Sequence, residues 1–435
     1  MGNEIIGLSY LLGGLVLIAL NMPIGISLGL AAFLGIAQML NAGAAFSLLS
    51  SAPYNLVGNW NFSAVPMFLL MGYVCTDAQL TNGLFRFMRI VLARLPGNLA
   101  ISSVGACALF AAASGSSVAT SSAMARIATP EMLKVGYDKG LATGVIAASG
   151  TLGSLIPPSI LMILFGVAAN VPVGALFLAG VIPGVLSALM YAGMIMMRSI
   201  LKPEIAPRAD ERYSMQDFLA ALWKIWPLPT LVMIVIGGIF FGFFSPTAAG
   251  AIGAFFALVI AFATGKYSFK LLAQSSFKAL EGTASIFVIM IGTDLLTRML
   301  AISGLPDQLT ELVIGNNLGP IEFVLAVGIV YLILGMFIDS IGILLLTLPL
   351  IVPIMDSMDM NLIWAGIVLI KLLEIGMMTP PVGLNVYVIK GALGDAVSLV
   401  DVFKGVGWFI MTDMVTLALL VAFPIISLFL PGLAK

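Results

Sequence analysis

The chain has 435 residues, of which 61% are hydrophobic and 9% are charged, and its formal net charge is −1. Soluble domains carry about 25% charged residues, so the composition excludes a soluble globular protein and indicates a polytopic membrane protein. The near-zero net charge predicts no nucleic-acid partner. The absence of histidine excludes imidazole metal sites, Ser-His-Asp triads and histidine proton relays.

The first half of the chain alternates apolar runs with short polar breaks. Helices are expected near 4–20, 23–40 and 63–76, then an amphipathic helix within 80–97, an uncharged run over 95–125, and spans near 140–156, 158–169 and 173–197. Because the start lacks the basic region of a secretory signal, the first helix is expected to remain a membrane span.

Residues 198–224 form the one clearly polar loop. Its basic residues are Arg198, Lys202, Arg208, Arg212 and Lys224. This excess of basic residues beside membrane spans predicts a cytoplasmic loop. The sequence then predicts spans near 227–243, 246–263 and 283–297, a polar surface segment at 303–320, an apolar stretch at 321–356, helices at 362–379 and 381–390, and a last span at 408–431 after an interfacial segment.

The two halves resemble each other in the order of these features. Each has a span, an amphipathic helix, a break rich in Gly, Pro or Asn, a long apolar stretch with a polar kernel, and a proline pair. Ser114 in the first kernel precedes Pro157 by 43 residues, and Asp339 in the second precedes Pro380 by 41. Internal duplication with interrupted helices at matching places is typical of secondary transporters.

The first kernel holds seven hydroxyl residues from Ser114 to Thr129, and six of them lie in the uncharged run over 95–125. Two interpretations are open. Small residues can serve tight helix packing in a membrane, or the chain can form a helical hairpin that breaks at Ser114–Ser117. Because non-helical backbone at membrane depth requires partners, such a break would offer carbonyls to a cation and amides to an anion.

Two proline pairs predict breaks in two other helices. Proline removes a backbone donor and clashes with the carbonyl four residues earlier. Pro157–Pro158 should therefore free carbonyls over 153–156, and Pro380–Pro381 should free those over 376–379. Each pair alone could be a simple kink, but the matched spacing favours two broken helices. Asn385 adds a side-chain amide just beyond the second break.

Asp339 is the only charged residue between 323 and 355. A charge at the centre of a membrane helix costs about 3 kcal/mol on insertion scales, so such a residue usually faces a cavity or has a partner. Asp339 is therefore either a functional acid at a cavity or a structural acid bonded to Ser340 or to neighbouring backbone. Two further pairs at helical spacing are interpreted as mainly structural: Asp294–Arg298 and Lys371–Glu374.

Four motifs carry a resemblance to a known family. They are AASGSSVATSSAMARIATPEM (112–132), GTLGSLIPPSI (150–160), AGVIPGV (179–185) and MTPPVGLNVYV (378–388). With these motifs in this order across nearly the whole chain, the sequence resembles the large membrane subunit of a tripartite ATP-independent periplasmic (TRAP) transporter, the DctM-type family. The resemblance implies a bacterial inner-membrane protein, not an enzyme, that imports carboxylates or sulfonates with a sodium gradient. Besides membrane lipid, it implies two partners: a periplasmic binding protein and a small four-helix membrane subunit, expected as a separate chain.

The resemblance also implies an elevator architecture. The predicted fold class is an all-α polytopic membrane protein with an inverted repeat and broken helices, in which two re-entrant hairpins, at 111–132 and 335–356, move with a transport domain against a scaffold. The predicted division is scaffold helices and a first arm helix at 1–97, the first half of the transport domain at 98–170, scaffold helices with the polar loop and a second arm at 171–320, the second half of the transport domain at 321–391, and an interfacial segment with the last span at 392–435.

Matching the motifs residue by residue implies two sodium sites where hairpin ends meet the broken helices, and no other cofactor. The first site would use Ser114, Gly150, Gly153 and Ile156, and the second Gly335, Gly376, Thr379 and Val382. The substrate is expected among Ser116, Ser117, Asp339, Ser340 and Asn385. Residues 111–122 and 335–349 contain no arginine, so sialic acid, a C4-dicarboxylate and an organic sulfonate all stay open as substrates.

The alternative function is a stand-alone proton- or sodium-coupled anion permease of related fold. In its proton-coupled form, Asp339 would carry the proton. An intramembrane aspartyl enzyme is disfavoured, because the first half has no acid at the place that matches Asp339.

Overall fold

A computed structural model describes residues 2–81, 83–207, 213–265 and 267–434, and every regular element in these ranges is a helix. The first half contains α1 (Asn3–Ala19), α2 (Ile24–Met39), α3 (Ala42–Gly58), η1 (Trp60–Ser63), α4 (Ala64–Asp77), α5 (Leu84–Val91), α6 (Asn98–Ser114), α7 (Ser117–Lys134), α8 (Lys139–Leu155), α9 (Ile160–Ala168) and α10 (Val173–Leu201). The second half contains η2 (Pro203–Ile205), α11 (Met215–Ile225), α12 (Pro227–Val232), η3 (Met233–Gly237), α13 (Gly238–Phe240), α14 (Pro246–Ala263), α15 (Phe269–Ser303), α16 (Leu305–Gly315), α17 (Pro320–Gly335), α18 (Ser340–Ser357), α19 (Leu362–Gly376), α20 (Leu384–Leu393), η4 (Gly394–Ala396), α21 (Leu399–Ala422) and α22 (Ile425–Leu433).

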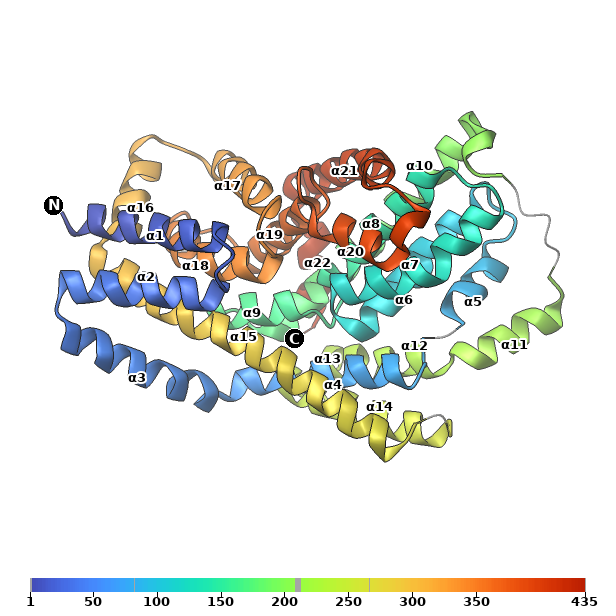
Figure 1. Cartoon of the computed structure of the whole chain (residues 1–435), viewed down its shortest axis with the longest axis horizontal. Helices are drawn as coiled ribbons and strands as arrows, with labels where there is room; N and C mark the ends of the chain where they lie inside the picture. The colour runs from blue at the N-terminus through green and yellow to red at the C-terminus, as the bar shows by residue number, and fades with distance from the viewer. Residues whose placement is uncertain (1, 82, 208–212, 266, 435) are drawn as a thin grey trace.

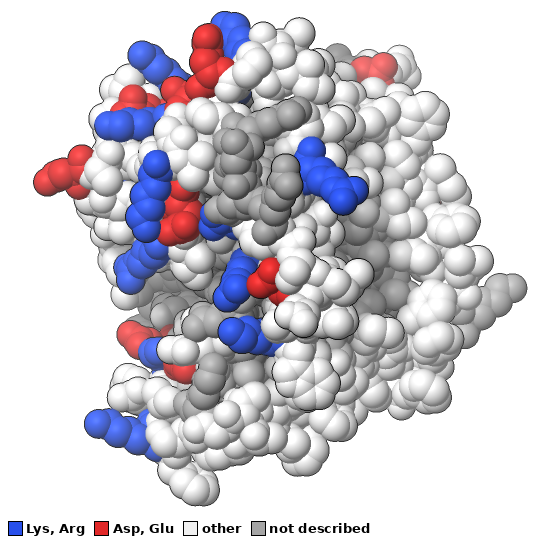
Figure 2. Space-filling view, turned by 90° about the vertical axis from the view of Figure 1, so that its right-hand side faces the viewer, with Lys and Arg blue, Asp and Glu red and all other residues white. Residues whose placement is uncertain are grey.

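The helices confirm a multi-pass membrane protein. Among the described residues, five helices are long and apolar enough to cross a membrane, or seven if two bent pairs each count as one span. Many large apolar side chains are exposed, as a lipid-facing surface requires. On the face drawn in Figure 2, the charged side chains gather along one side, and the rest of that face is nearly uncharged.

Several expected boundaries are wrong, among them the start of the span expected at 283–297, because α15 begins at Phe269. The helix α3 was not predicted from the sequence; it begins after Asn41 and contains several small and polar residues. The polar loop 198–224 contains the amphipathic α11, whose first turn is closed by a capping box between Ser214 and Asp217. The last span, expected at 408–431, begins at Leu399, where Ser398 and Asp401 form a second capping box, and ends at Ala422; α22 is a separate helix after it. Arg208 and Arg212 of the loop lie outside the described residues.

The helices pack as two groups that contact each other. In the first group, α15 lies against α1, α2, α3 and α4, and α14 lies against α4; Figure 1 shows α15 crossing the lower part of the molecule beside α2 and α4. In the second group, α8 packs against α6, α7 and α21, and α19 packs against α17, α10 and α21. The groups meet where α4 contacts α6 and where α18 contacts α15 and α2.

The internal repeat is visible in the contacts of the second group. α6 and α7 form a hairpin followed by the broken pair α8 and α9, and α17 and α18 form a hairpin followed by α19 and α20. The second arm of each hairpin packs on the broken helix of its own half, α7 on α8 and α18 on α19. The far piece of each broken helix crosses over, so α9 packs on α18 and α20 packs on α7. This exchange fixes the two halves in one body.

Both hairpins are longer than predicted. The first runs over 98–134 instead of 111–132, and the second over 320–357 instead of 335–356. The division into scaffold and transport domains stays a prediction, because packing does not show which parts move. α10 and α21, which that division places outside the transport domain, pack against α8 and α19. The predicted boundary after residue 391 falls inside α20.

Candidate functional site

The first hairpin turns inside the first polar kernel, over the four residues from Ser114 to Ser117. α6 ends at Ser114, Gly115 adopts the left-handed region with φ of 59°, and Ser116 caps α7 by accepting from the Ala119 N–H. The Ser114 hydroxyl lies 2.9 Å from that of Thr120, which donates to the Ser116 carbonyl at 2.8 Å. The predicted break at Ser114–Ser117 is therefore confirmed.

This tip packs directly on the first broken helix. α8 and α9 meet at a bend of 41° around the proline pair. The Ser117 and Ser154 hydroxyls are 2.6 Å apart. A Cβ on Gly153 would lie 2.9 Å from the Ser116 carbonyl carbon, so only glycine allows the tip to approach α8 this closely.

The other residues predicted for the first sodium site lie around this contact. Gly150 faces Ser121 of α7, and the Ile156 side chain packs against Gly184 of α10. The structure thus brings Ser114, Gly150 and Gly153 to one junction of α6, α7 and α8. Ile156 lies at the break itself, where its carbonyl belongs to the end of α8.

Asp339 begins the second arm of the second hairpin. Its Oδ1 accepts from the N–H groups of Ile341 at 2.8 Å and Gly342 at 3.2 Å, so the carboxylate is the N-cap of α18. Asp339 is half-buried and Ser340 is buried. The carboxylate thus has the backbone partners of a structural acid, and its contact with substrate stays a prediction.

Replacing Asp339 by Ala is expected to lower the stability of the protein by about 1 kcal/mol, because two N–H groups of α18 lose their acceptor. Asn caps helices as well as Asp does, so Asp339→Asn is expected to keep the stability. Thermal unfolding of the purified variants tests both expectations. Equal losses for Ala and Asn would show that the carboxylate charge, and not the cap, matters for stability.

The second kernel is built by close backbone contacts. A Cβ on Gly335 would lie 2.7 Å from the Gly376 Cα, so the end of α17 rests directly on the end of α19. Thr379 donates to the Ile375 carbonyl at 2.7 Å, and Val382 is half-buried in the turn that follows. Of the four residues predicted for the second sodium site, the structure brings Gly335 onto Gly376, and Thr379 and Val382 follow in the break after α19.

Asn385 lies deeper than the prediction of a substrate ligand suggests. Its side chain is fully buried, and its Nδ2 donates to the Ala147 carbonyl of α8 at 3.3 Å. In the described part of the chain, its Oδ1 has no hydrogen-bond donor. In this structure Asn385 joins the second broken helix to the first rather than lining an open cavity.

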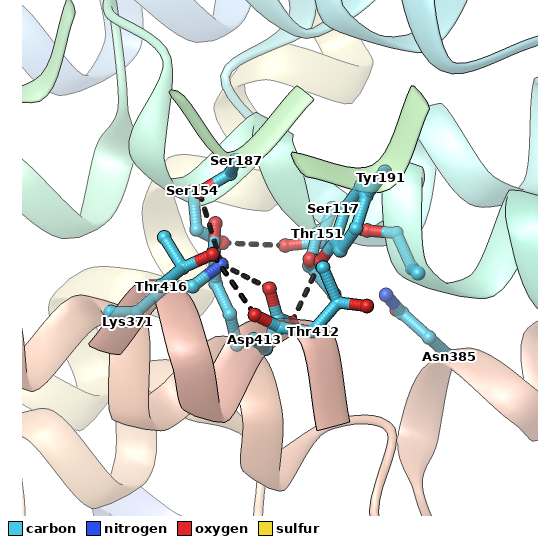
Figure 3. Close-up of polar contacts among 12 residues, drawn as sticks. Ser117, Thr151, Ser154, Ser187, Tyr191, Lys371, Asn385, Thr412, Asp413 and Thr416 are labelled. Atoms are coloured by element: carbon cyan, nitrogen blue, oxygen red, sulfur yellow. Dashed lines mark hydrogen bonds and ion pairs between the residues drawn. The ribbon is translucent and has the colours of Figure 1, made fainter. Parts of the chain in front are cut away.

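A cluster of three fully buried charged side chains lies where α10, α19 and α21 meet. Lys371 Nζ is 3.0 Å from Glu374 Oε2 and 2.6 Å from Asp413 Oδ1. The contact with Asp413 Oδ1 is an ion pair whose angles are not those of a hydrogen bond. Lys371 also donates to Ser187 at 3.2 Å, and Tyr191 donates to Asp413 Oδ2 at 2.7 Å. Figure 3 shows Lys371 and Asp413 of this cluster in the same view as the Ser117–Ser154 contact and Asn385.

The sequence reading found only part of this cluster. The structure shows the predicted pair Lys371–Glu374, whose structural role stays an interpretation, but Asp413 on a distant helix was not predicted. Asp413 is the only charged residue between 405 and 434, and this isolation was the available signal. With two carboxylates and one ammonium, the cluster joins α19 to both α10 and α21.

A cavity of about 470 Å³ lies between the two groups of helices. One wall, from α3, its following loop and α15, carries polar side chains, and the other, from α9 and α18, is apolar. The polar residues are Asn55, Asn59, Thr293, Asp294 and Thr297. Asp294 accepts from Arg298 Nε at 2.9 Å, as the predicted pair requires. None of the residues predicted to bind substrate lines this cavity.

Comparisons with known proteins agree with this arrangement. The family described as "Tripartite ATP-independent periplasmic transporter, DctM component" matches residues 11–426. The chain is 33% identical to the C4-dicarboxylate TRAP transporter large permease protein DctM of Vibrio cholerae, over 95% of this chain and 94% of that protein. It is 30% identical to the sialic acid TRAP transporter large permease protein SiaM of the same organism, over 97% of each chain.

Two further comparisons extend these findings. The ectoine TRAP transporter large permease protein TeaC of Halomonas elongata is 30% identical, over 96% of this chain and 97% of that protein. The crystal structure of the YdaH transporter of Alcanivorax borkumensis matches with a TM-score of 0.64 at 15% identity, over 89% of this chain and 90% of that chain, which shows a shared fold. The relatives in sequence are named as transporter permeases, which confirms the expectation that the chain is not an enzyme.

Proposed function

Because the chain belongs to the DctM family of tripartite ATP-independent periplasmic transporters, we propose that it is the large permease subunit of a sodium-coupled importer of small organic anions. The observation that carries this proposal is the matched pair of junctions. In each half, a hairpin end meets a broken helix through glycine contacts, Ser116 with Gly153 in one and Gly335 with Gly376 in the other.

Sodium coupling is proposed from the chemistry of these junctions. Carbonyls at the ends of α8 and α19, with the Ser114 hydroxyl, are hard oxygen ligands that suit a small cation. Those of Ser154, Gly376 and Met377 already accept one hydrogen bond each, so a cation would use their second lone pair. Binding of sodium at both junctions would order the hairpin ends and prepare the site for an anion. Two sodium ions carried with a singly charged substrate would move one net charge, which a membrane potential drives by about 2.3 kcal/mol per 100 mV.

An elevator movement is proposed from the contacts between the two helix groups. Both hairpin ends touch the first group: a Cβ on Gly72 of α4 would lie 3.2 Å from the Ser114 carbonyl oxygen, and a Cβ on Gly342 would meet Ile24 of α2. A substrate bound at the hairpin ends would therefore lie at the boundary between the groups. Movement of one group along the other would carry it across the membrane without opening a continuous pore.

The substrate class is proposed as a carboxylate or sulfonate of modest size. Relatives are named for C4-dicarboxylate, sialic acid and ectoine, and each of these molecules carries a carboxylate. The hairpin amides, Ser116, Ser117 and Ser340 are the proposed anion ligands, because hydroxyl and N–H donors near helix starts bind carboxylates. The proposed location is the bacterial inner membrane, with a small membrane subunit and a periplasmic binding protein as partners.

The proposal is tested by reconstituting the chain with its cognate small subunit in proteoliposomes and measuring uptake of labelled sialic acid, a C4-dicarboxylate and ectoine. Uptake of one of these is expected only when the cognate binding protein is added outside. A preparation without the large chain is the control for leakage. Uptake that is equally fast without binding protein would contradict the tripartite assignment and favour a stand-alone permease.

A further inference from the structure

The Lys371 cluster, which consists of Lys371, Glu374 and Asp413, contains one more acid than base. None of the three side chains has any exposed surface. Among the described residues, Lys371 is the only cation that pairs with either acid, and its Nζ lies 3.0 Å from Glu374 Oε2 and 2.6 Å from Asp413 Oδ1. One ammonium and two carboxylates leave a net charge of −1 in the interior when all three groups are ionised.

One carboxylate oxygen of the cluster has no partner. Within the described ranges, nothing donates to Glu374 Oε1, although this atom is buried. Asp413 is better satisfied, because Tyr191 donates to its Oδ2 at 2.7 Å. A buried carboxylate that lacks a compensating charge is costly. The excess charge of the cluster therefore requires either a cation in its neighbourhood or a proton on one of the two acids.

The cluster lies directly before the second junction. Glu374 is two residues before Gly376, the last residue of α19, so the two residues are about 3 Å apart along the helix axis. The carbonyls proposed as sodium ligands there are neutral. Asp339 is the other acid near this junction, four residues after Gly335, and its Oδ1 is already used as the cap of α18.

The cluster also reaches the broken helix of the first junction. The Tyr191 hydroxyl, which donates to Asp413, contacts Thr151 of α8 (Figure 3). Thr151 stands between Gly150 and Gly153, the two residues through which α8 meets the first hairpin. The excess negative charge is therefore close to both broken helices, in the part of each helix that precedes its break.

We propose that the excess negative charge of the Lys371 cluster is the counter-charge for sodium at the two junctions. This inference rests on the sodium coupling proposed above, and it adds charged residues that attract the ion without binding it. A unit charge about 10 Å from a cation, at an effective dielectric constant of about 20, changes the affinity for that cation roughly tenfold. The cluster thus raises the sodium affinity of sites whose own ligands are neutral oxygens.

The proposal is tested by thermal unfolding of the purified full chain, titrated with sodium chloride while choline chloride keeps the ionic strength constant. Sodium bound to the folded state raises the Tm. Glu374→Gln and Asp413→Asn each remove the excess charge and leave one acid with Lys371. Each variant is expected to need about tenfold more sodium than the parent chain for the same rise in Tm. Glu374→Asp keeps the charge and is expected to respond to sodium as the parent does.

The Tm in choline alone separates this role from a merely structural one. Because Glu374→Gln and Asp413→Asn remove an uncompensated buried charge, their Tm without sodium is expected to equal or exceed that of the parent chain. A lower Tm for both variants in choline would overturn the proposal, since both acids would then already be balanced without sodium.

Glu131→Gln is the control for removing an acid from an ion pair elsewhere. Glu131 pairs with Lys134 at 2.9 Å, and it lies about 20 Å along α7 from Ser117. Its sodium response is expected to equal that of the parent chain. The proposal is overturned if Glu374→Gln and Asp413→Asn need no more sodium than Glu131→Gln, the result expected if a proton balances the cluster. A parent chain whose Tm and uptake do not respond to sodium contradicts the proposed coupling itself, and this inference with it.

Discussion

Replacing Lys371 by Met is expected to destabilise the protein by about 3–5 kcal/mol, the usual result of removing one partner from a buried ion pair. Lys371 is the only cation of a cluster in which Glu374 and Asp413 have no exposed surface. Without the ammonium, two carboxylates are left together in the interior, and Glu374 Oε1 already lacks a partner among the described residues. The measurement is thermal unfolding of the purified chain, together with its yield from membranes.

The matched control is Lys278→Met. Lys278 pairs with Asp77 at 2.9 Å, but its side chain is 47% exposed, so the loss is expected to stay below about 1 kcal/mol. A rescue variant adds Glu374→Gln and Asp413→Asn to Lys371→Met, which removes the uncompensated charge and is expected to recover most of the stability. If Lys371→Met is no less stable than Lys278→Met, the cluster does not hold α19 to α10 and α21.

Replacing Gly335 by Ala is expected to reduce uptake by about 100-fold, the usual consequence of moving a binding group by about 1 Å. The added Cβ would lie 2.7 Å from the Gly376 Cα, so the ends of α17 and α19 must separate. Because Ala favours a helix more than Gly does, the variant is expected to fold. Initial uptake rates in proteoliposomes at several sodium concentrations measure the effect, and the sodium concentration for half-maximal uptake is expected to rise.

Gly193→Ala is the control for this substitution. Gly193 lies in α10, and a Cβ there has no described neighbour within 4 Å. Its uptake is expected to equal that of the parent chain. Equal uptake by Gly335→Ala and Gly193→Ala would show that the contact between α17 and α19 has no part in transport.

The elements that the sequence predicts well are those that proline, glycine and hydroxyl residues mark locally. The break at Ser114–Ser117 and the two interruptions at the proline pairs follow from backbone chemistry within a few residues, and the structure has all three. The expected resemblance of the halves is equally local, because it depends on the order of such breaks. The family assignment rests on the same motifs and is confirmed by the comparisons.

The features that sequence reasoning missed depend on contacts between distant segments. Nothing near Lys371 indicates that Asp413 completes its cluster, because α21 reaches α19 only through tertiary packing. α3 was omitted because its small and polar residues lack a clear apolar run, and its stability comes from packing on α2 and α15. The burial of Asn385 also depends on such contacts, because α20 crosses onto α7 and α8; its predicted part in substrate binding stays a prediction.

The central claim, that sodium binding at the two junctions drives transport, is tested most directly by ion replacement in the complete reconstituted system. Proteoliposomes that contain the chain and its small subunit receive the binding protein, labelled substrate and either external sodium or choline at equal ionic strength. Uptake is expected in sodium and is expected to fall to the level of empty vesicles in choline. Uptake that is unchanged in choline would contradict the claim.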